Sequence, residues 1–442
     1  MDIENTLDEV ALDAVVAELF DRQPQRMVPD LDRITALTDL LGHPERSYPS
    51  FQVTGTNGKT TTTTMVACLL GALGLRAGAY TSPHLQDVRE RIRVATELIS
   101  GRDLAERIGE LSPFLAEIDR RHAERLTFFE VLTALAYVHF ADVPVDAGVF
   151  EVGMGGRWDA TNLVRGEVAV LTTVGLDHPQ LGSTVAEVAW EKAGIVKPGA
   201  VVVSAVQEPE AAEVIAEAAD RQEGRLVVAG RDFGLRSWQA AVGGQQLHLQ
   251  GVTSDVDEVF LPLYGAHQAA NAALALAAVE GFLGFSGGLA PEVVREGFAA
   301  VRAPGRLEVV RREGEPTVIL DGAHNPGGAR ALAAALRGEF VFPRRVLVLG
   351  VLGDKDVEGM CDVLVPAVDE VVVTAPPSTR AADLDRLADA VRAAGGDVAV
   401  AQDVGQALSL GSELAGDGGG VVVTGSLYTV GAARDALGLA PS

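Results

Sequence analysis

A glycine-rich loop is the segment of this sequence whose residue types and spacing point most directly to chemistry. It occupies residues 55–60, between the short apolar run Phe51–Val53 and a stretch with helical composition. Glycines allow backbone N–H groups to turn inward onto phosphate oxygens, and a following helix directs its positive end at them. Lys59 would neutralise the β- and γ-phosphates, and the hydroxyl of Thr60 or Thr61 would reach Mg²⁺. We therefore predict a nucleotide site made by Gly55, Thr56, Asn57, Gly58, Lys59, Thr60 and Thr61.

A carboxylate and a histidine follow two further apolar runs in the same half of the chain. Glu151 comes directly after Ala147–Phe150, and His178 comes shortly after Val168–Val174. Because ligands bind at the carboxyl ends of parallel strands, both side chains are expected to reach a metal on the glycine-rich loop. The alternative for Glu151 is a plain acidic strand end, and an isolated histidine is more often a surface or core residue.

The second half repeats this arrangement. Asp321 and His324 follow the apolar run Thr317–Leu320, and Ser426 and Tyr428 follow the run Gly420–Thr424. If the two halves face each other, these residues and the glycine-rich loop line one cleft. Two other segments are less informative by themselves: Ser82-Pro83-His84 is typical of a helix-capping loop, and Lys192 of an ordinary helix lysine.

The elements expected around these residues form two α/β domains. Apolar strands alternate with helices from Phe51 to Ser204, which favours a doubly wound parallel sheet. Residues 225–263 contain short alternating strands (Leu226–Val228, Gln246–Leu249 and Glu258–Leu261) and are expected to form a small antiparallel appendage. After the linker 301–305, a second strand–helix series predicts a smaller Rossmann-like domain. The predicted boundaries are 1–302 for the phosphate-loop domain and 303–442 for the second domain.

Composition limits the classes of partner. The 442 residues include 36 basic and 61 acidic ones, which gives a net charge of −25. Such a surface repels nucleic acid and anionic membranes, so neither is expected as a partner, and ATP must be held by local donors and a metal. The N-terminus does not resemble a signal peptide, and no apolar run approaches the ~18–20 residues of a membrane span. With only two cysteines, Cys68 and Cys361, we expect a cytoplasmic monomer with reduced thiols.

Taken in order, the motifs resemble those of the folylpolyglutamate synthase and dihydrofolate synthase family of amide ligases, whose superfamily includes the Mur enzymes. The resemblance runs from about Ile34 to Arg434, and its specificity lies in the order and spacing of many short stretches. The matching stretches are Val53–Lys59, Thr81–Leu85, Glu90–Ile92, Thr127–Glu130, Glu151–Asn162, Leu176–His178, Glu191–Lys197, His267–Asn271, Pro304–Glu308, Asp321–Pro326, Gly353–Asp356 and Gly425–Tyr428.

The resemblance implies roles for particular residues. Glu151, His178 and a loop threonine would hold a first Mg²⁺, with Ser82 near a second, and Lys192 would be carbamylated and act on a metal. Asn271, Arg306 and Asp321 would contact ATP. Asp321, His324, Ser426 and Tyr428 would line the amino-acid side of the cleft. The substrate side would also include Arg91, Thr127, Phe129, Arg157, Asp159 and Ala160, and the catalytic residues would be Lys59, Lys192, Asp321 and His324.

One departure from the family concerns the phosphate loop. Most members have Gly-Lys-Gly-Ser, whereas this chain has Gly58-Lys59-Thr60-Thr61, as in Mur ligases. The general phosphate-loop rule assigns the metal to Thr60, alignment to the family serine assigns it to Thr61, and we favour Thr60.

The activity implied is ATP-dependent addition of L-glutamate to the terminal carboxylate of folates through an acyl phosphate. Activity on dihydropteroate is also expected. The alternative is an enzyme that only extends folates, in which Phe128 and Phe129 are core residues. Trp158 stands where many members of the family have an aliphatic residue. Two rival functions are a Mur-type ligase for peptidoglycan precursors and a nucleotide-dependent switch. The Ser82-Pro83-His84 and Gly425–Tyr428 segments argue against the first, and the second-domain motifs argue against the second.

Overall fold

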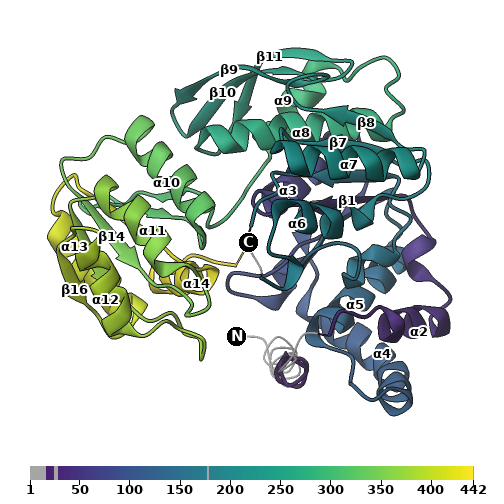
Figure 1. Cartoon of the computed structure of the whole chain (residues 1–442), viewed down its shortest axis with the longest axis horizontal. Helices are drawn as coiled ribbons and strands as arrows, with labels where there is room; N and C mark the ends of the chain where they lie inside the picture. The colour runs from purple at the N-terminus through teal and green to yellow at the C-terminus, as the bar shows by residue number, and fades with distance from the viewer. Residues whose placement is uncertain (1–15, 24–27, 177–178, 442) are drawn as a thin grey trace.

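The protein folds into two α/β bodies, a larger one followed along the chain by a smaller one (Figure 1). The computed structural model describes residues 16–23, 28–176 and 179–441. The predicted fold class is confirmed: a large, mostly parallel sheet comes first, a small antiparallel sheet adjoins it, and a smaller mixed sheet follows. Residues 16–20 are helical. Within the described part of the chain, every helix is too short or too polar to cross a membrane.

The first sheet has the strand order β4-β3-β2-β5-β1-β6-β7-β8, in which β3 and β4 run antiparallel to their neighbours and the other strands are parallel. Its central strands are buried on both faces because helices cover each side, which is why they are continuous apolar runs in the sequence. The strands are β1 (Ser50–Thr54), β2 (Ala77–Tyr80), β3 (Ile92–Val94), β4 (Glu97–Leu98), β5 (Ala147–Glu151), β6 (Val168–Leu171), β7 (Val201–Ser204) and β8 (Arg225–Val228).

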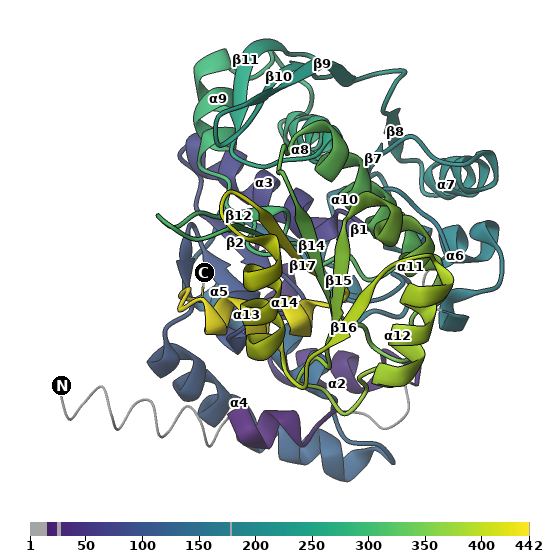
Figure 2. The same ribbon diagram turned by 90° about the vertical axis from the view of Figure 1, so that its left-hand side faces the viewer.

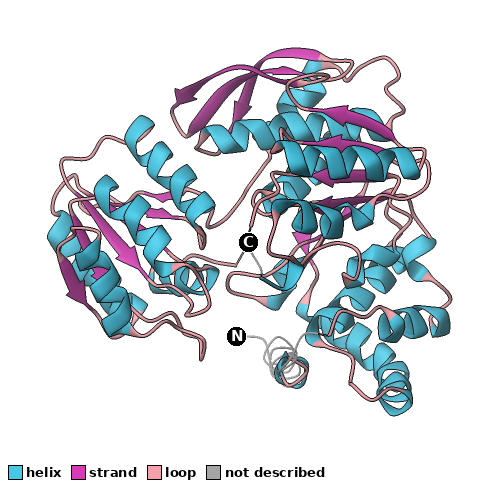
Figure 3. Cartoon of the chain, viewed as in Figure 1, coloured by secondary structure: helices cyan, strands magenta, loops and turns pink. Residues whose placement is uncertain are grey.

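Two layers of helices enclose this sheet, as Figure 3 shows by secondary structure. Apolar side chains of α3, α8 and α9 share one core with Phe51 and Val53 of β1. On the opposite face, α4 and α5 pack around Phe150, while α6 and α7 pack against Ala169 and Leu171. The helices are α2 (Asp32–Leu40), α3 (Lys59–Ala72), α4 (Gly101–Arg121), α5 (Phe128–Asp142), α6 (Val185–Lys192), α7 (Pro209–Arg221), α8 (Ala266–Phe282) and α9 (Pro291–Ala299).

The antiparallel appendage contains β9 (Gly234–Ala241), β10 (Gly244–Gln250) and β11 (Asp255–Leu261), in the order β11-β10-β9. Leu247 and Val259 join the core formed with α8. One expectation was wrong here, because the segment Leu226–Val228 belongs to β8 and pairs in parallel with β7 of the large sheet. A four-residue strand carries too little pattern to reveal its partner. Strand β9 was missed because its side chains are mostly exposed and polar.

The second body has the strand order β12-β13-β17-β14-β15-β16, parallel except for β12. Helices cover both faces, and Figure 2 shows this body nearest the viewer. Its strands are β12 (Glu308–Val310), β13 (Thr317–Leu320), β14 (Arg345–Leu349), β15 (Glu370–Val373), β16 (Val398–Val400) and β17 (Gly420–Thr424). Its helices are α10 (Pro326–Gly338), α11 (Val357–Leu364), α12 (Leu384–Ala393), α13 (Val404–Ala415) and α14 (Leu427–Ala436). The boundary at 302/303 stays a prediction.

Candidate active site

The glycine-rich loop lies between β1 and α3, and two of its glycines are required by their surroundings. Gly55 and Gly58 have φ angles of 146° and 90°, a region that side chains rarely adopt. A Cβ atom at Gly55 would lie 1.8 Å from Oγ1 of Thr172, and one at Gly58 would lie 2.7 Å from Oδ1 of Asn271. The loop is therefore confined between the end of β6 and α8, with its backbone free to approach a ligand closely.

Two lysines meet one carbonyl oxygen of this loop. Lys59 Nζ donates to Gly55 O at 3.0 Å and to Thr56 O at 3.3 Å. Lys192 Nζ, at the end of α6, donates to the same Gly55 O at 2.7 Å, and its side chain is buried. The two lysine side chains thus meet at the loop where phosphate oxygens are expected.

Oxygen donors gather where β5 ends. Glu151 is buried and accepts hydrogen bonds from Thr60 Oγ1 at 2.8 Å and from Ser82 N at 3.0 Å. Burial raises the pKa of Glu151, and Lys59 and the two hydrogen bonds partly oppose this rise. A carboxylate beside two hydroxyl residues is a donor set that suits Mg²⁺. His178, the other expected metal ligand, lies outside the described residues.

Carboxylates, histidines and cysteines alone do not form a metal cluster of three or more within the described ranges. The expected sites instead combine Glu151 with hydroxyl residues. Of the two candidate threonines, Thr60 directs its hydroxyl at Glu151, whereas Thr61 is buried, at 2% exposure.

Arg306 connects the linker to the phosphate loop. Its Nη2 lies 3.4 Å from Thr60 Oγ1. Asp321, at the end of β13, accepts backbone N–H groups from Leu307 at 2.9 Å and Ala323 at 3.0 Å. Burial raises the pKa of the Asp321 carboxyl, and Arg306 opposes that rise. The carboxylate thus orders the backbone directly after Arg306.

Further contacts bring the second body to the loop. Asn325 Nδ2 donates to Asn57 Oδ1 at 3.2 Å across the two bodies. His324 Nδ1 lies 2.8 Å from Gly322 O, in the turn between Asp321 and α10. Ser426 caps α14 by accepting from Thr429 N at 3.0 Å.

Tyr428, in the first turn of α14, is 45% exposed. Burial lowers the pKa of the Arg91 guanidinium, and the nearby side chains of Tyr80, Glu151 and Tyr428 partly oppose this lowering. Arg91 Nε donates to His84 Nδ1 at 2.9 Å. Burial, then Arg91, lowers the pKa of His84 to about 4, so its neutral ring accepts this bond at neutral pH.

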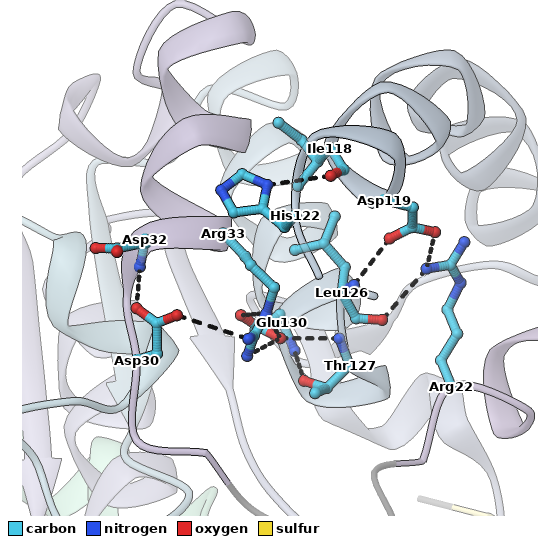
Figure 4. A network of polar contacts seen from close by, with 10 residues as sticks. All are labelled: Arg22, Asp30, Asp32, Arg33, Ile118, Asp119, His122, Leu126, Thr127 and Glu130. Atoms are coloured by element: carbon cyan, nitrogen blue, oxygen red, sulfur yellow. Dashed lines mark hydrogen bonds and ion pairs between the residues drawn. The ribbon is translucent and has the colours of Figure 1, made fainter. Parts of the chain in front are cut away.

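Thr127 and Phe129 lie at the start of α5. Thr127 Oγ1 accepts from Glu130 N at 3.2 Å, and the Glu130 carboxylate accepts from Thr127 N at 2.8 Å. Figure 4 shows that Glu130 also pairs with Arg33 of α2, which fixes this helix start. The Phe129 ring lies against Gly153, where a Cβ atom would come within 2.7 Å of Cζ.

The remaining expected substrate residues lie in the glycine-rich segment after β5. Asp159 is buried and accepts from Met154 N at 3.0 Å and Thr161 N at 2.9 Å. Burial raises its pKa. Ala160 is buried and its carbonyl accepts from Tyr137. Arg157 instead places its guanidinium 3.9 Å from the ring centroid of the exposed Trp190.

Sequence reasoning assigned no role to two residues of this region, Thr172 and Glu90. Thr172 donates to Asn57 O at 2.7 Å and so braces the phosphate loop. The sequence feature that could have identified Thr172 is a hydroxyl residue directly after the apolar run of β6. Glu90 accepts three backbone N–H groups, from Leu85, Gln86 and Asp87, and orders the loop after Ser82. Its signal was the spacing of Asp87 and Glu90, which form a capping box.

Comparison with known proteins agrees with this arrangement. Residues 53–279 match the family model of the Mur ligase middle domain, and residues 305–427 match that of the Mur ligase, glutamate ligase domain. A dihydrofolate synthase/folylpolyglutamate synthase of Mycobacterium tuberculosis is 44% identical over 99% of this chain and 96% of its own length. A folylpolyglutamate synthase of Lacticaseibacillus casei is 35% identical over 79% of this chain and 82% of its own length.

Solved structures give the same result. Mycobacterium tuberculosis folylpolyglutamate synthase complexed with ADP superposes with a TM-score of 0.94 at 44% identity, over 98% of this chain and all of that one. An FPGS–AMPPCP–folate complex superposes with a TM-score of 0.85 at 32% identity, over 96% of this chain and 99% of that one. The chain therefore belongs to the Mur ligase family, among its folylpolyglutamate synthase/dihydrofolate synthase members.

Proposed function

We propose that this ATP-dependent ligase joins L-glutamate to the terminal carboxylate of folates and also to dihydropteroate. The observation that carries the proposal is the junction of two half-sites. The phosphate loop and Glu151 belong to the first body, and Arg306 and Asn325 of the second body contact that loop directly. The relatives named as folylpolyglutamate synthases, and the solved complex with AMPPCP and folate, support the same substrates.

The reaction requires activation, because a carboxylate is a poor electrophile. In the proposed sequence, a carboxylate oxygen of the folate attacks the γ-phosphorus of ATP, and ADP leaves with the electrons of the broken P–O bond. The amine nitrogen of glutamate then attacks the acyl carbon, the bond to the phosphate oxygen breaks, and phosphate and a proton are released. Lys59 stabilises the developing phosphate charge, and the surrounding residues hold the reactants in place.

We assign Thr60, Glu151 and Ser82 to the Mg²⁺ sites. The support is the contact of Glu151 with Thr60 Oγ1 and Ser82 N, together with the oxygen chemistry of these side chains. When bound, Mg²⁺ neutralises phosphate charge. We also propose that Lys192 is carbamylated. A ¹³C carbamate resonance from labelled bicarbonate, absent in Lys192→Arg, is the expected result, and an unmodified amine at neutral pH with bicarbonate would contradict it.

On the substrate side, Phe129 and Asp159 are assigned to the pterin and Arg91 to the substrate chain between the bodies. Asp321, His324, Ser426 and Tyr428 are assigned to the glutamate half. The exposure of Tyr428 and its proximity to Arg91 support this assignment. Arg157 is engaged with Trp190, so its contact with substrate requires the guanidinium to leave that ring.

Release of ADP tests the proposal. Tetrahydrofolate, dihydropteroate and a UDP-linked peptidoglycan precursor are offered separately, each with and without glutamate. We expect glutamate-dependent release with the first two and none with the third. Lys59→Ala should abolish it, whereas Arg102→Ala, which removes an exposed cation on α4, should not. Undiminished turnover in Lys59→Ala would contradict the assignment of the phosphate loop.

Activity on dihydropteroate is tested separately, by following dihydrofolate chromatographically. Relatives named dihydrofolate synthase/folylpolyglutamate synthase support this second activity. Absence of this product, under conditions that extend tetrahydrofolate, would refute the second activity and leave the ligase assignment standing.

We also propose a cytoplasmic monomer of two domains, 1–302 and 303–442, with neither nucleic acid nor membrane as partner. The acidic surface and the free thiols Cys68 and Cys361 support the absence of these partners and a reducing compartment. Light scattering, cell fractionation and trypsin cleavage at the exposed Arg302 test these statements. A dimer, or a first cut within either proposed domain, would contradict them.

A further inference from the structure

A short loop of the first body is seated in the second body. It comprises residues 82–87, here called the seam loop. Leu85 packs against the core cluster that includes α14. A Cβ atom at Gly431 of α14 would lie 2.2 Å from Leu85 O, and one at Gly305 would lie 3.2 Å from Leu85 Cδ1. Backbone and side chain of Leu85 therefore meet the second body where only glycine fits.

Gln86 adds a set of polar contacts at this seam. Its Nε2 donates to Asp435 Oδ1 at 2.7 Å and to Leu439 O at 2.9 Å. Its Oε1 accepts from Arg434 Nε at 2.6 Å. Both donors and the acceptor of the amide are thus directed at one helix end. Arg434 is itself buried and pairs with Glu308 of β12, so the contact reaches the edge strand of the second body's sheet.

The other end of the seam loop belongs to the active site. Ser82 N donates to Glu151 at 3.0 Å, and His84 accepts from Arg91. The Glu90 carboxylate holds the intervening backbone through its bonds from the N–H groups of Leu85, Gln86 and Asp87. A displacement of Gln86 is therefore transmitted to the residues around Glu151.

On the second body, helix α14 runs between the same two places, the seam and the active site. Ser426 caps its start, Tyr428 lies in its first turn, and Arg434 and Asp435 lie in its last turn. Because a ten-residue helix is stiff, the position of its last turn sets the position of its first. We propose that Gln86 is a positioning residue that holds α14 in register with Glu151, so that the glutamate half of the site faces the activated carboxylate. This inference rests on the proposed function.

The competing explanation is that the seam loop is held by the packing of Leu85 alone. In that case Gln86 contributes to stability and leaves the relative placement of the half-sites unchanged. Three variants separate the two. Gln86→Ala removes the amide, and Gln86→Met keeps its length without its polar atoms. Gln406→Ala is the matched control, because that exposed amide also bonds an aspartate, Asp403, but on α13.

Steady-state kinetics of ADP release give the first readout. With two or more hydrogen bonds lost, we expect kcat/KM for glutamate to fall by about tenfold or more in Gln86→Ala and Gln86→Met, with KM for ATP within about twofold of wild type. Gln406→Ala should match wild type. Normal kinetics in Gln86→Met, or equal losses for ATP and glutamate, would overturn the proposal.

Hydrogen exchange gives a second readout that needs no turnover. In the free protein, amides of residues 82–87 and 427–436 should exchange faster in Gln86→Met, while those of α3 should not. Unchanged exchange in both segments would overturn the positioning role. A wild type that shows no glutamate-dependent ADP release would refute the proposed function, and faster exchange would still support the contact between the bodies.

Gly431→Ala disturbs the same seam sterically, because the added Cβ would clash with Leu85 O. Gly338→Ala is its control, because a Cβ there meets nothing within 4 Å. We expect Gly431→Ala to raise KM for glutamate, and its effect and that of Gln86→Ala to be less than additive because both act on one contact. Fully additive effects would contradict a shared seam.

Discussion

Replacement of Glu151 by glutamine separates the charge of this side chain from its hydrogen bonds. The carboxylate accepts from Ser82 N and Thr60 Oγ1 while it is buried. A glutamine of the same shape can still accept from Ser82 N, and its NH₂ group can donate to the Thr60 hydroxyl. Both contacts survive in Glu151→Gln, whereas Glu151→Ala leaves a buried N–H group without its acceptor.

The expected magnitudes differ for stability and for turnover. Glu151→Ala should lower the free energy of unfolding by about 1–3 kcal/mol, the cost of one unsatisfied buried group, and Glu151→Gln by less than about 1 kcal/mol. Turnover should fall by about 10²–10³-fold in both, the loss typical when a preorganised charge-stabilising group is removed. Chemical denaturation and ADP release measure the two quantities on the same samples.

The pH dependence gives an independent check. Because burial raises the pKa of Glu151, the folded state binds its proton more tightly than the unfolded state does. The wild type therefore loses stability from this group as pH rises above its ordinary value of 4.5 and through the folded value. Glu151→Gln has no such loss, so its unfolding free energy should gain on that of wild type as pH rises above 4.5, until the raised folded-state pKa is passed.

Two results would refute the reasoning. Turnover of Glu151→Gln within a few-fold of wild type would show that the charge of Glu151 does not act in the reaction. A variant that loses stability relative to wild type as pH rises would show that burial does not dominate the pKa of this carboxyl. Thermal shift with Mg²⁺ and ATP is the supporting control, because the ligand-induced stabilisation should be smaller in the variant.

Three further predictions concern residues around the site. Thr60→Ala should lower turnover by about tenfold or more and weaken the dependence on Mg²⁺, whereas Thr61→Ala should act chiefly on stability; the reverse order in a Mg²⁺ titration would assign the metal to Thr61. Gly55→Ala should weaken ATP binding by tenfold or more in calorimetry because its Cβ collides with Thr172, while Gly71→Ala, which meets nothing within 4 Å, should bind normally; equal affinities would contradict the confinement of the loop. Arg33→Ala should lower the free energy of unfolding, measured in urea, by about 3–5 kcal/mol, because Glu130 loses its buried partner. A loss below about 1 kcal/mol would show that the capping contacts alone hold Glu130.

Local sequence was sufficient wherever one strand and the loop after it carry the information. The apolar run before Gly55, the helix after it and the position of Glu151 directly after Phe150 placed these residues at the same edge of a parallel sheet, and the structure has β1 beside β5. Parallel strands end at the same edge of a sheet, so a carboxylate at the end of such a strand lies at the edge where ligands bind. The same reasoning placed Asp321 after β13 and Ser426 after β17.

Only the tertiary structure decided which distant residues meet. Gln86 and Arg434 are 348 positions apart, and Arg306 and Thr60 are 246 apart. Lys192, at the end of α6, donates to Gly55 O across 137 positions of the chain. Strand β8 pairs in parallel with β7 of the large sheet and not with the antiparallel appendage. Such contacts depend on how whole layers pack, and neither residue type nor spacing carries that information.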